Sequence, residues 1–224
     1  MRGCFITFEG GEGAGKSTQI ARLRRRIEAA GQPVLVTREP GGSPRAERIR
    51  KFLLAGGARA HGPLAEAVLF TSARIDHLER TIRPALGAGT HVLCDRFADS
   101  TRAYQGALGS LDEATLAGLE RVAVGETVPD LTLVLDLPPE TGLERVRRRQ
   151  AERGEGADRF ETEGLPFHVA LREAFLRIAA GAPQRCVVID AGRDEDAVEA
   201  AVWRAVQERL PRAAGGAGSA RHGA

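Results

Sequence analysis

One lysine and one serine end a glycine-rich segment near the N-terminus. Residues 10–17 read Gly-Gly-Glu-Gly-Ala-Gly-Lys-Ser, a spacing in which glycines let successive backbone N–H groups turn toward a bound phosphate. Lys16 would reach the β- and γ-phosphates of a nucleoside triphosphate, and the Ser17 hydroxyl would bind Mg²⁺. The alternative is a glycine-rich turn with an incidental lysine, although only Lys16 and Lys51 are lysines among 32 basic residues. The pattern predicts a triphosphate site made of Gly10, Gly11, Glu12, Gly13, Ala14, Gly15, Lys16, Ser17 and Thr18.

An acid and an arginine follow another apolar run. Asp95 ends the run Val92–Asp95 and could also assist Mg²⁺, and Arg96 comes next. At the carboxyl edge of a parallel strand beside the first loop, Arg96 could hold a second anion that faces the triphosphate. The alternative is a structural ion pair at a strand end. Two facing anions suit transfer of a phosphoryl group from one to the other, and the chain has no N-K-x-D motif for guanine.

Five short apolar runs, each followed by a segment of helical periodicity, must position these residues. Because the runs are nearly continuous in apolar residues, both faces of each strand are expected to be covered by helices. The sequence therefore predicts an α/β three-layer sandwich with a five-stranded parallel sheet. The expected strands are Cys4–Phe8, Val34–Thr37, Val92–Asp95, Leu131–Leu137 and Cys186–Asp190.

Helices are predicted by apolar spacing and by the glycines and prolines that end them. Residues 1–212 show no linker and are expected to form a single domain, whereas the Gly/Ala-rich residues 213–224 lack an apolar period and are expected to be a disordered tail. The expected helices are Lys16–Ala30, Leu64–Ile82 stopping before Pro84, Glu140–Arg153, Leu165–Ala180 and Glu195–Leu210.

Composition excludes several classes of protein. The 224 residues are 42% hydrophobic and 28% charged, with a net charge of +2, which argues against a uniformly basic binder of nucleic acid or of membrane surfaces. No apolar run approaches the roughly 20 residues that span a bilayer. The three cysteines have no C-x-x-C spacing, which favours reduced thiols and a cytoplasmic protein. The five histidines show no metal-ligand spacing.

With its motifs taken together, residues 3 to about 210 resemble the bacterial-type thymidylate kinases of the nucleoside-monophosphate kinase group of P-loop NTPases. The Arg-Glu-Pro-Gly-Gly and Asp-Arg…Ser-Thr…Ala-Tyr-Gln-Gly segments are the most specific in combination. The resemblance lies in residues 8–17, 37–43 (Thr-Arg-Glu-Pro-Gly-Gly-Ser), 69–74 (Leu-Phe-Thr-Ser-Ala-Arg), 95–97, 100–101, 103–106, 129–136 and 158–161 (Asp-Arg-Phe-Glu).

Phe70 and Arg74 share a face of their predicted helix. Phe70 lies about 120° from the centre of the apolar stripe that is expected to face the core, and Arg74 lies about 40° from Phe70. By resemblance, this pair stacks on thymine and hydrogen-bonds its O4 edge; the alternative packs Phe70 against a neighbouring helix. The stripe consists of Leu64, Val68, Thr71, Ile75, Leu78 and Ile82.

The resemblance implies further residues for the acceptor nucleotide. Arg96 would grip the monophosphate, and Tyr104 would crowd C2′ of the sugar and so favour deoxyribose. Tyr104 could instead be structural, but as the only tyrosine in the chain it is not expected to belong to an aromatic core. The remaining dTMP residues are Arg38 and Arg50 as helpers of Arg96, and Ser100 and Thr101 near the base edge.

The transition-state cation has to come from outside the phosphate-binding loop. The resemblance assigns Glu12 to the sugar 3′-OH or to positioning the two substrates, and Gly13 stands where one branch of the family has a catalytic arginine. A lid over residues 149–161 would supply the cation instead, with Arg153 favoured and Arg149 in reserve. For Arg145, Arg147 and Arg148 the alternative is a solvated helix face.

The expected function is phosphorylation of dTMP to dTDP with ATP and Mg²⁺, which supplies dTTP for DNA synthesis. The catalytic residues would be Lys16, Glu12, Arg96 and Arg153. Ser17 and Asp95 would bind the Mg²⁺ ion. By resemblance the protein is a homodimer, with no nucleic-acid or membrane partner. The alternatives are a kinase for another nucleoside monophosphate or small acceptor, and a P-loop ATPase or switch protein.

Overall fold

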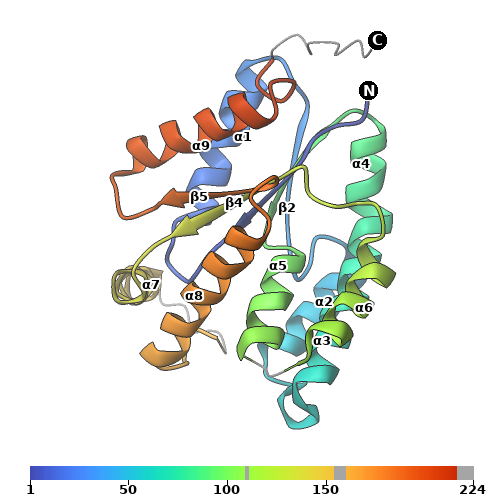
Figure 1. The fold of residues 1–224 in the computed structure, drawn as a ribbon, viewed down its shortest axis with the longest axis vertical. Helices are drawn as coiled ribbons and strands as arrows, with labels where there is room; N and C mark the ends of the chain where they lie inside the picture. Colours follow the sequence, from blue (N-terminus) through green and yellow to red (C-terminus); the bar gives the residue numbers. More distant parts are fainter. Residues whose placement is uncertain (109–110, 154–159, 216–224) are drawn as a thin grey trace.

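A parallel sheet forms the centre of the molecule, with strand order β2-β3-β1-β4-β5 (Figure 1). The computed structural model describes residues 1–108, 111–153 and 160–215. Each strand agrees with its predicted run to within one residue, and the predicted fold class is confirmed. The strands of the described chain are β1 (Phe5–Glu9), β2 (Val34–Arg38), β3 (His91–Asp95), β4 (Leu131–Asp136) and β5 (Cys186–Asp190).

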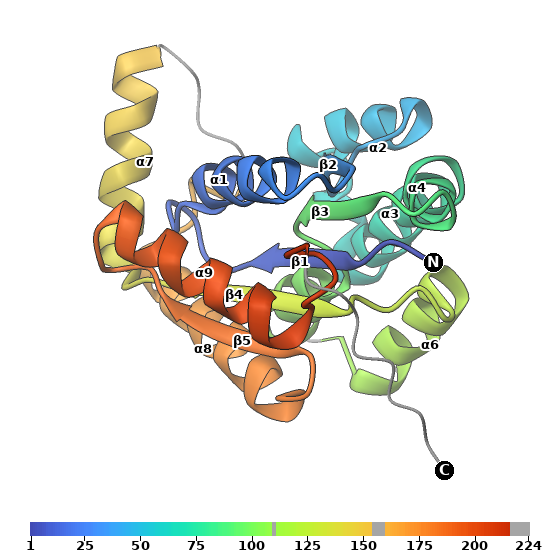
Figure 2. The same cartoon turned by 90° about the horizontal axis from the view of Figure 1, so that it is seen from above.

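Helices cover both faces of the sheet (Figure 2). On one face, α1 (Lys16–Ala29) and α9 (Glu195–Arg209) pack on Ile6 and Phe8 of β1. On the other face, Phe5 of the same strand packs against the elements that follow α3 (Gly62–His77), and α8 (Leu165–Gly181) covers β4 and β5. Since each strand buries both of its faces, the apolar runs are continuous and do not alternate.

Several short elements and two helices of 11 and 12 residues were not predicted from the sequence. They are α2 (Pro44–Leu54), a 3₁₀ turn η1 (Arg59–His61), α5 (Ala98–Thr101), a π-helical segment η3 (Arg102–Leu108) and α6 (Glu113–Val124). The remaining helices lie close to the predicted ranges. They are α3 (Gly62–His77) with its continuations η2 (Leu78–Ile82) and α4 (Arg83–Gly87), α7 (Pro139–Arg153) and α8 (Leu165–Gly181).

The predicted helix stop before Pro84 is wrong. After α3, the chain widens into the π turn of η2 and then continues as α4, in whose first turn Pro84 lies. A proline in the first turn of a helix leaves no hydrogen bond unmade, because the N–H groups there have no partner within the helix. Pro84 therefore begins a helical segment at this position.

The predicted core stripe of α3 is also partly wrong. Leu64, Val68 and Ile75 are 51%, 43% and 37% exposed. The face of α3 that is buried carries small or polar side chains, among them Ala67, Thr71, Ala73, Arg74 and His77. Helical periodicity located the stripe, but half of its members face outward.

The described chain continues past residue 212, the predicted end of the domain. Ala213, which was assigned to the tail, is fully buried against the α1–α9 layer, and the described chain ends at Gly215. Residues 216–224, where the rest of the predicted tail falls, lie outside the described residues. Within the described chain, no helix combines the length and the hydropathy that crossing a membrane requires.

Candidate active site

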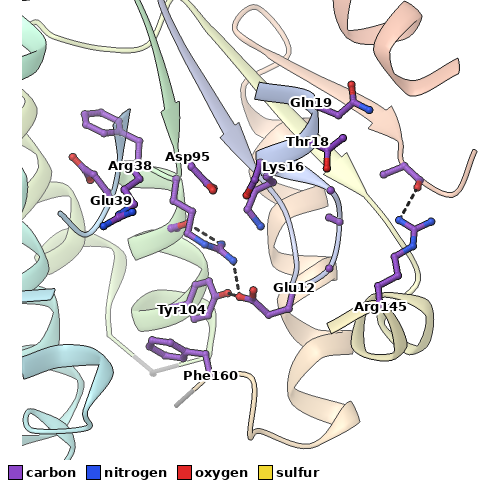
Figure 3. Close-up of a pocket in the computed structure, with 18 of the residues that line it drawn as sticks. Glu12, Lys16, Thr18, Gln19, Arg38, Glu39, Asp95, Tyr104, Arg145 and Phe160 are labelled. Carbon is purple, nitrogen blue, oxygen red and sulfur yellow. Dashed lines mark hydrogen bonds and ion pairs between the residues drawn. The ribbon is translucent and has the colours of Figure 1, made fainter. Parts of the chain in front are cut away.

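A cavity of about 1020 Å³ opens at the carboxyl edge of the sheet (Figure 3). Edges of this kind are where parallel α/β sheets bind ligands. The cavity brings together most of the predicted site residues from several separate helices, strands and loops. Its lining includes Glu12, Gly13, Ala14, Gly15, Lys16, Ser17, Thr18, Arg38, Arg50, Phe70, Arg74, Asp95, Arg96, Ser100, Thr101 and Tyr104.

The P-loop, residues 10–17, wraps from the end of β1 into the start of α1. Gly10, Gly13 and Gly15 have φ angles of 131°, 68° and 87°, which L-residues with side chains rarely adopt. Lys16 lies back across this loop and donates to the carbonyl oxygens of Gly10 (3.2 Å) and Gly11 (3.0 Å). Burial lowers the pKa of Lys16.

A glycine-to-glycine contact joins the P-loop to α7. A Cβ added at Gly13 would lie 2.1 Å from the carbonyl oxygen of Gly142, and one added at Gly142 would lie 2.3 Å from the carbonyl oxygen of Glu12. No side chain fits at either position without moving backbone. The contact therefore excludes an arginine at position 13 of this chain.

Glu12 and Arg96 meet across the cavity. Arg96 Nη2 lies 2.6 Å from Glu12 Oε1, and the Tyr104 hydroxyl donates to the same oxygen at 2.9 Å. Burial alone would raise the pKa of Glu12, but Arg96, with Lys16 and Tyr104, holds this pKa down at about 2. Arg96 also stands 5.3 Å from the centre of the Tyr104 ring. Glu12 therefore remains an anion that fixes the guanidinium in the cleft.

The turn that carries Arg96 is strained and is held by Glu9. Arg96 has a φ of +67°, unlike any other non-glycine residue in the described chain. The Glu9 carboxylate, fully buried at the end of β1, accepts from Phe97 N (2.8 Å) and Ser100 Oγ (2.6 Å). Burial raises the pKa of Glu9 to about 7. Sequence reasoning missed Glu9, although a carboxylate that ends an apolar strand is itself a signal.

A second buried carboxylate anchors α5, which carries Ser100 and Thr101. Asp99 receives both terminal nitrogens of Arg185, at 2.6 and 2.8 Å. Arg185 also donates to Thr132 Oγ1 on β4 at 2.9 Å. This bidentate pair fixes the short helix to the sheet.

Arg74 is buried deep in the acceptor side of the cavity. Its Nε donates to Glu39 Oε2 at 2.7 Å, and its Nη2 donates to Thr101 Oγ1 at 3.0 Å. The guanidinium stands 5.2 Å from the centre of the Phe97 ring. Phe70, half-buried one turn earlier on α3, lines the same cavity. A planar ligand there would meet an aromatic face and a cationic edge.

Arg38 and Arg50 lie in the cavity wall formed by β2 and α2. Arg38 is 55% exposed and pairs with Glu47 at 3.2 Å. Arg50 donates to the carbonyl oxygen of Pro40 at 2.7 Å. Exposure leaves Arg38 free to change partners at little cost, since exposed ion pairs contribute little.

Tyr104 belongs to an aromatic cluster, so the expectation drawn from its being the only tyrosine is wrong. Its ring centre lies 4.9, 6.1 and 6.4 Å from those of Phe160, Phe167 and Phe175. Phenylalanines supplied the aromatic neighbours that a count of tyrosines could not reveal. The ring is packed, and its hydroxyl still reaches Glu12 in the cavity.

Arginines of α7 line the opposite wall. Arg145 donates to the carbonyl oxygen of Ala191 at 3.5 Å (Figure 3), and Arg149 pairs with Glu161 at 3.0 Å. Arg148 also lines the cavity, from an exposed position on the same helix. Arg153 is the last residue of α7, and its side chain and all of residues 154–159 lie outside the described part.

The cavity continues toward the loop between β5 and α9, which sequence reasoning did not include. Gln19 Nε2 donates to the carbonyl oxygen of Glu195 at 3.1 Å and links α1 to the start of α9. The additional lining residues are Gln19, Ala191, Arg193, Asp194, Glu195 and Val198.

The family model and the relatives that match this chain all carry the same description. The family model described as thymidylate kinase matches residues 8–202. The chain is 56% identical over 210 residues to a thymidylate kinase of Bradyrhizobium diazoefficiens, covering 93% of this chain and 91% of that protein. It is 57% identical over 209 residues to one from Caulobacter vibrioides, with coverage of 93% and 98%. One from Nitrobacter winogradskyi is 56% identical, with coverage of 93% and 90%.

The Gly142 contact makes a prediction about stability. Gly142→Ala would force α7 away from the P-loop, because its Cβ would overlap the Glu12 carbonyl. We expect the free energy of unfolding to fall by about 2 kcal/mol, as for other overpacked sites, and the KM for ATP to rise. Gly181→Ala is the control, since space is open at Gly181 near the end of α8. Equal stability of the two variants in denaturant titration would contradict the proposed tight contact.

Proposed function

Since the chain belongs to the thymidylate kinase family and so phosphorylates dTMP, we propose that it transfers the γ-phosphoryl group of ATP in line to dTMP, between the P-loop and Arg96. The observation that carries this proposal is the Glu12–Arg96 contact, which brings a triphosphate loop and an acceptor wall to one point. A switch protein would need the first of these and not the second. The product is dTDP.

The P-loop is the donor site. Its N–H groups and the start of α1 would hold the phosphates of ATP. Lys16 would leave the carbonyls of Gly10 and Gly11 for the β- and γ-phosphates, where its charge offsets the charge of the transferring group. The nucleoside of ATP would extend toward Arg145 and the loop between β5 and α9.

Arg96 is the acceptor-phosphate residue. A dTMP phosphate would replace the Glu12 carboxylate on the guanidinium, with Arg38 and Arg50 as helpers. Glu12 would then accept from the sugar 3′-OH, and so place the acceptor oxygen in line with the γ-phosphate. Because the strained turn fixes Arg96 before substrate arrives, little reorganisation is needed during the reaction.

The base and sugar of dTMP would lie between α3 and η3. Phe70 would stack on thymine, Arg74 would donate to its O4 edge, and Ser100 and Thr101 would lie near that edge. The Tyr104 ring, held by its phenylalanine neighbours, would leave no space for a 2′-hydroxyl. Steric exclusion of this kind needs a rigid ring, which the cluster supplies.

The donor oxygens near the P-loop fit a magnesium ion. Asp95 Oδ1 is buried and has no hydrogen-bond partner among the described residues, and the Ser17 hydroxyl lines the same cavity. Mg²⁺ prefers oxygen ligands and is often bound by one or two protein groups together with substrate phosphates. Bound there, the ion would neutralise charge on the phosphates of ATP.

The lid supplies the last cation. Gly13 cannot carry a side chain, and α7 already directs Arg145, Arg148 and Arg149 into the cavity. We place the transition-state charge on Arg153, at the end of this helix, with Arg149 in reserve. Closure of the lid would also exclude water and limit hydrolysis of ATP.

A homodimer would cover the outward apolar stripe of α3. Leu64, Val68 and Ile75 share one face of this helix and are exposed. On either side of α3, which contacts both α2 and α6, Phe52 is 48% and Val122 is 76% exposed. Apolar side chains gathered on neighbouring helices are typical of an interface between subunits.

Lys16 tests the donor site. Lys16→Ala should lower the rate of dTDP formation at least 10³-fold, as loss of a charge that acts on the transferring phosphoryl group does. Circular dichroism and dTMP binding by calorimetry should remain close to wild type. Lys51→Ala, which removes the other lysine from an exposed position on α2, is the control. Near-normal activity of Lys16→Ala would remove the P-loop from the mechanism.

Arg153 tests the lid. Arg153→Ala should lower kcat about 10³-fold and raise KM far less, because the charge it opposes builds up in the transition state. Arg147→Ala on the same helix should change kcat little. Should Arg149→Ala lose kcat while Arg153→Ala keeps it, the lid mechanism stands with a different residue. Retention of kcat within tenfold by every single lid substitution would overturn it.

Val68 tests the dimer. Val68→Asp puts a charge in the centre of the stripe. The mass measured by sedimentation should therefore fall from that of two chains to that of one chain. Val128→Asp is the control, because Val128 is similarly exposed, at 46%, but lies on the loop between α6 and β4. A wild-type protein that sediments as one chain at micromolar concentration would contradict the proposal directly.

A further inference from the structure

A buried chain of polar side chains runs from β2 to Arg74. Thr37 Oγ1 lies 2.7 Å from His77 Nε2, and His77 Nδ1 lies 3.1 Å from Glu39 Oε1. Glu39 Oε2 in turn accepts from Arg74 Nε at 2.7 Å. His77 is fully buried, and the side chains of Glu39 and Arg74 are 5% and 4% exposed. Three of these residues, Thr37, His77 and Glu39, have no part in the mechanism described above.

We propose that His77 is a positioning residue for recognition of the acceptor base. It holds the Glu39 carboxylate in one orientation, and this carboxylate aims the guanidinium of Arg74 at the base. The inference rests on the proposed role of Arg74 in binding thymine. His77 would act through Glu39 and Arg74 and would touch no substrate itself.

The hydrogen bonds of Arg74 define which of its nitrogens is left for a ligand. Nε is engaged by Glu39 and Nη2 by Thr101, whereas Nη1 makes no hydrogen bond to the described protein. Because a guanidinium is planar and rigid, fixing Nε and Nη2 also fixes the direction in which Nη1 donates. A base that accepts at one edge position is then distinguished from one that donates there.

Glu39 can hold Arg74 only if its own carboxylate is held. The last torsion of a glutamate side chain is broad, so a carboxylate with one donor can turn and carry its partner with it. His77 supplies the second donor, on the oxygen that Arg74 does not use. Since an ionised carboxylate only accepts, Nδ1 of His77 must carry the proton of this hydrogen bond, and the Thr37 hydroxyl can pair with Nε2 as a donor or as an acceptor.

The loop after β2 closes over this chain. A Cβ added at Gly42 would lie 2.3 Å from His77 Nε2 and 2.5 Å from Thr37 Oγ1. The Thr81 hydroxyl donates to the Gly42 carbonyl at 2.9 Å and holds the loop in place. Because backbone packs directly on the imidazole, His77 has no room to move. The fixed imidazole holds the Glu39 carboxylate in one orientation, and this carboxylate in turn holds the Arg74 guanidinium.

Two amide substitutions separate the two nitrogens of His77. The amide of asparagine can take the place of Nδ1, and the amide of the longer glutamine can take the place of Nε2. His77→Gln should therefore lose the hydrogen bond to Glu39, and His77→Asn should keep it. We expect His77→Gln to raise the KM for dTMP about tenfold, the usual effect of losing a hydrogen bond to a charged group, with kcat within about threefold of wild type.

The second measurement is kcat/KM for dTMP divided by kcat/KM for dCMP. A residue that only stabilises the fold would leave this ratio unchanged when it is substituted. Cytosine donates from N4 where thymine accepts at O4, so a misdirected Arg74 should reduce this ratio about tenfold in His77→Gln. His77→Asn should stay within about threefold of wild type in both quantities. If the two variants keep the wild-type ratio and lose only thermal stability, His77 is structural and the inference is overturned.

Arg74→Lys separates this inference from the function on which it rests. A lysine retains the charge but not the fixed fork, so dTMP binding and discrimination should both fall. Unchanged discrimination in Arg74→Lys would overturn the role of Arg74 itself. Loss in Arg74→Lys without loss in His77→Gln would overturn the role of His77 alone.

Nitrogen NMR of the wild-type protein tests the same point without a substitution. With ¹⁵N-labelled histidine, the His77 ring should show a proton on Nδ1. A ring protonated on Nε2 alone could not donate to Glu39, and this result would overturn the inference even if every variant failed to fold.

Discussion

The ion pair between Glu12 and Arg96 is the contact on which the arrangement of the cleft depends. β1 and β3 are adjacent and parallel, with Phe8 opposite Asp95, so the residues that follow the two strands emerge side by side. One strand leads into the P-loop and the other into the turn that carries Arg96. Burial of the Glu12 carboxylate would be costly without the guanidinium, and the guanidinium would lie unpaired in the cleft without the carboxylate. The pair therefore holds Arg96 ready, and a substrate phosphate that displaces the carboxylate finds its cation already in place.

Backbone constraints keep both sides of this pair rigid. The left-handed conformation of Arg96 is maintained by Glu9, which accepts from Phe97 and Ser100, and strain of this kind persists only where surrounding structure enforces it. On the donor side, Gly13 and Gly142 bring the P-loop and α7 into direct backbone contact. The helix that carries the lid arginines is thus fixed at its N-terminal end, and any closing motion must come from its C-terminal end. Phosphoryl transfer depends on positioning and on neutralising charge, and these backbone contacts would provide the positioning.

Sequence reasoning predicted the parts of this molecule that depend on local pattern. The strands followed from continuous apolar runs, and the residues expected in the P-loop, on α3 and after β3 line one cavity. It was wrong where tertiary contacts decide. The stripe of Leu64, Val68 and Ile75 is apolar and periodic, but nothing in the sequence tells an apolar face that is buried in the core from one that is exposed. Glu9 offered a signal, as a carboxylate at the end of an apolar strand, but its partners and those of Glu39 and His77 come from elements far apart in the chain.

Initial rates with a panel of acceptors test the central claim that the cleft joins ATP to dTMP. ATP and Mg²⁺ would be supplied with dTMP, dUMP, dCMP, dAMP or dGMP in turn, and with no acceptor, and both ADP and the nucleoside diphosphate would be measured. The account predicts that dTMP gives the highest kcat/KM and that ADP forms at least about 100-fold more slowly without an acceptor, since the complete site assembles only around both substrates. Hydrolysis of ATP at the same rate with and without dTMP, or preference for another monophosphate, would contradict it.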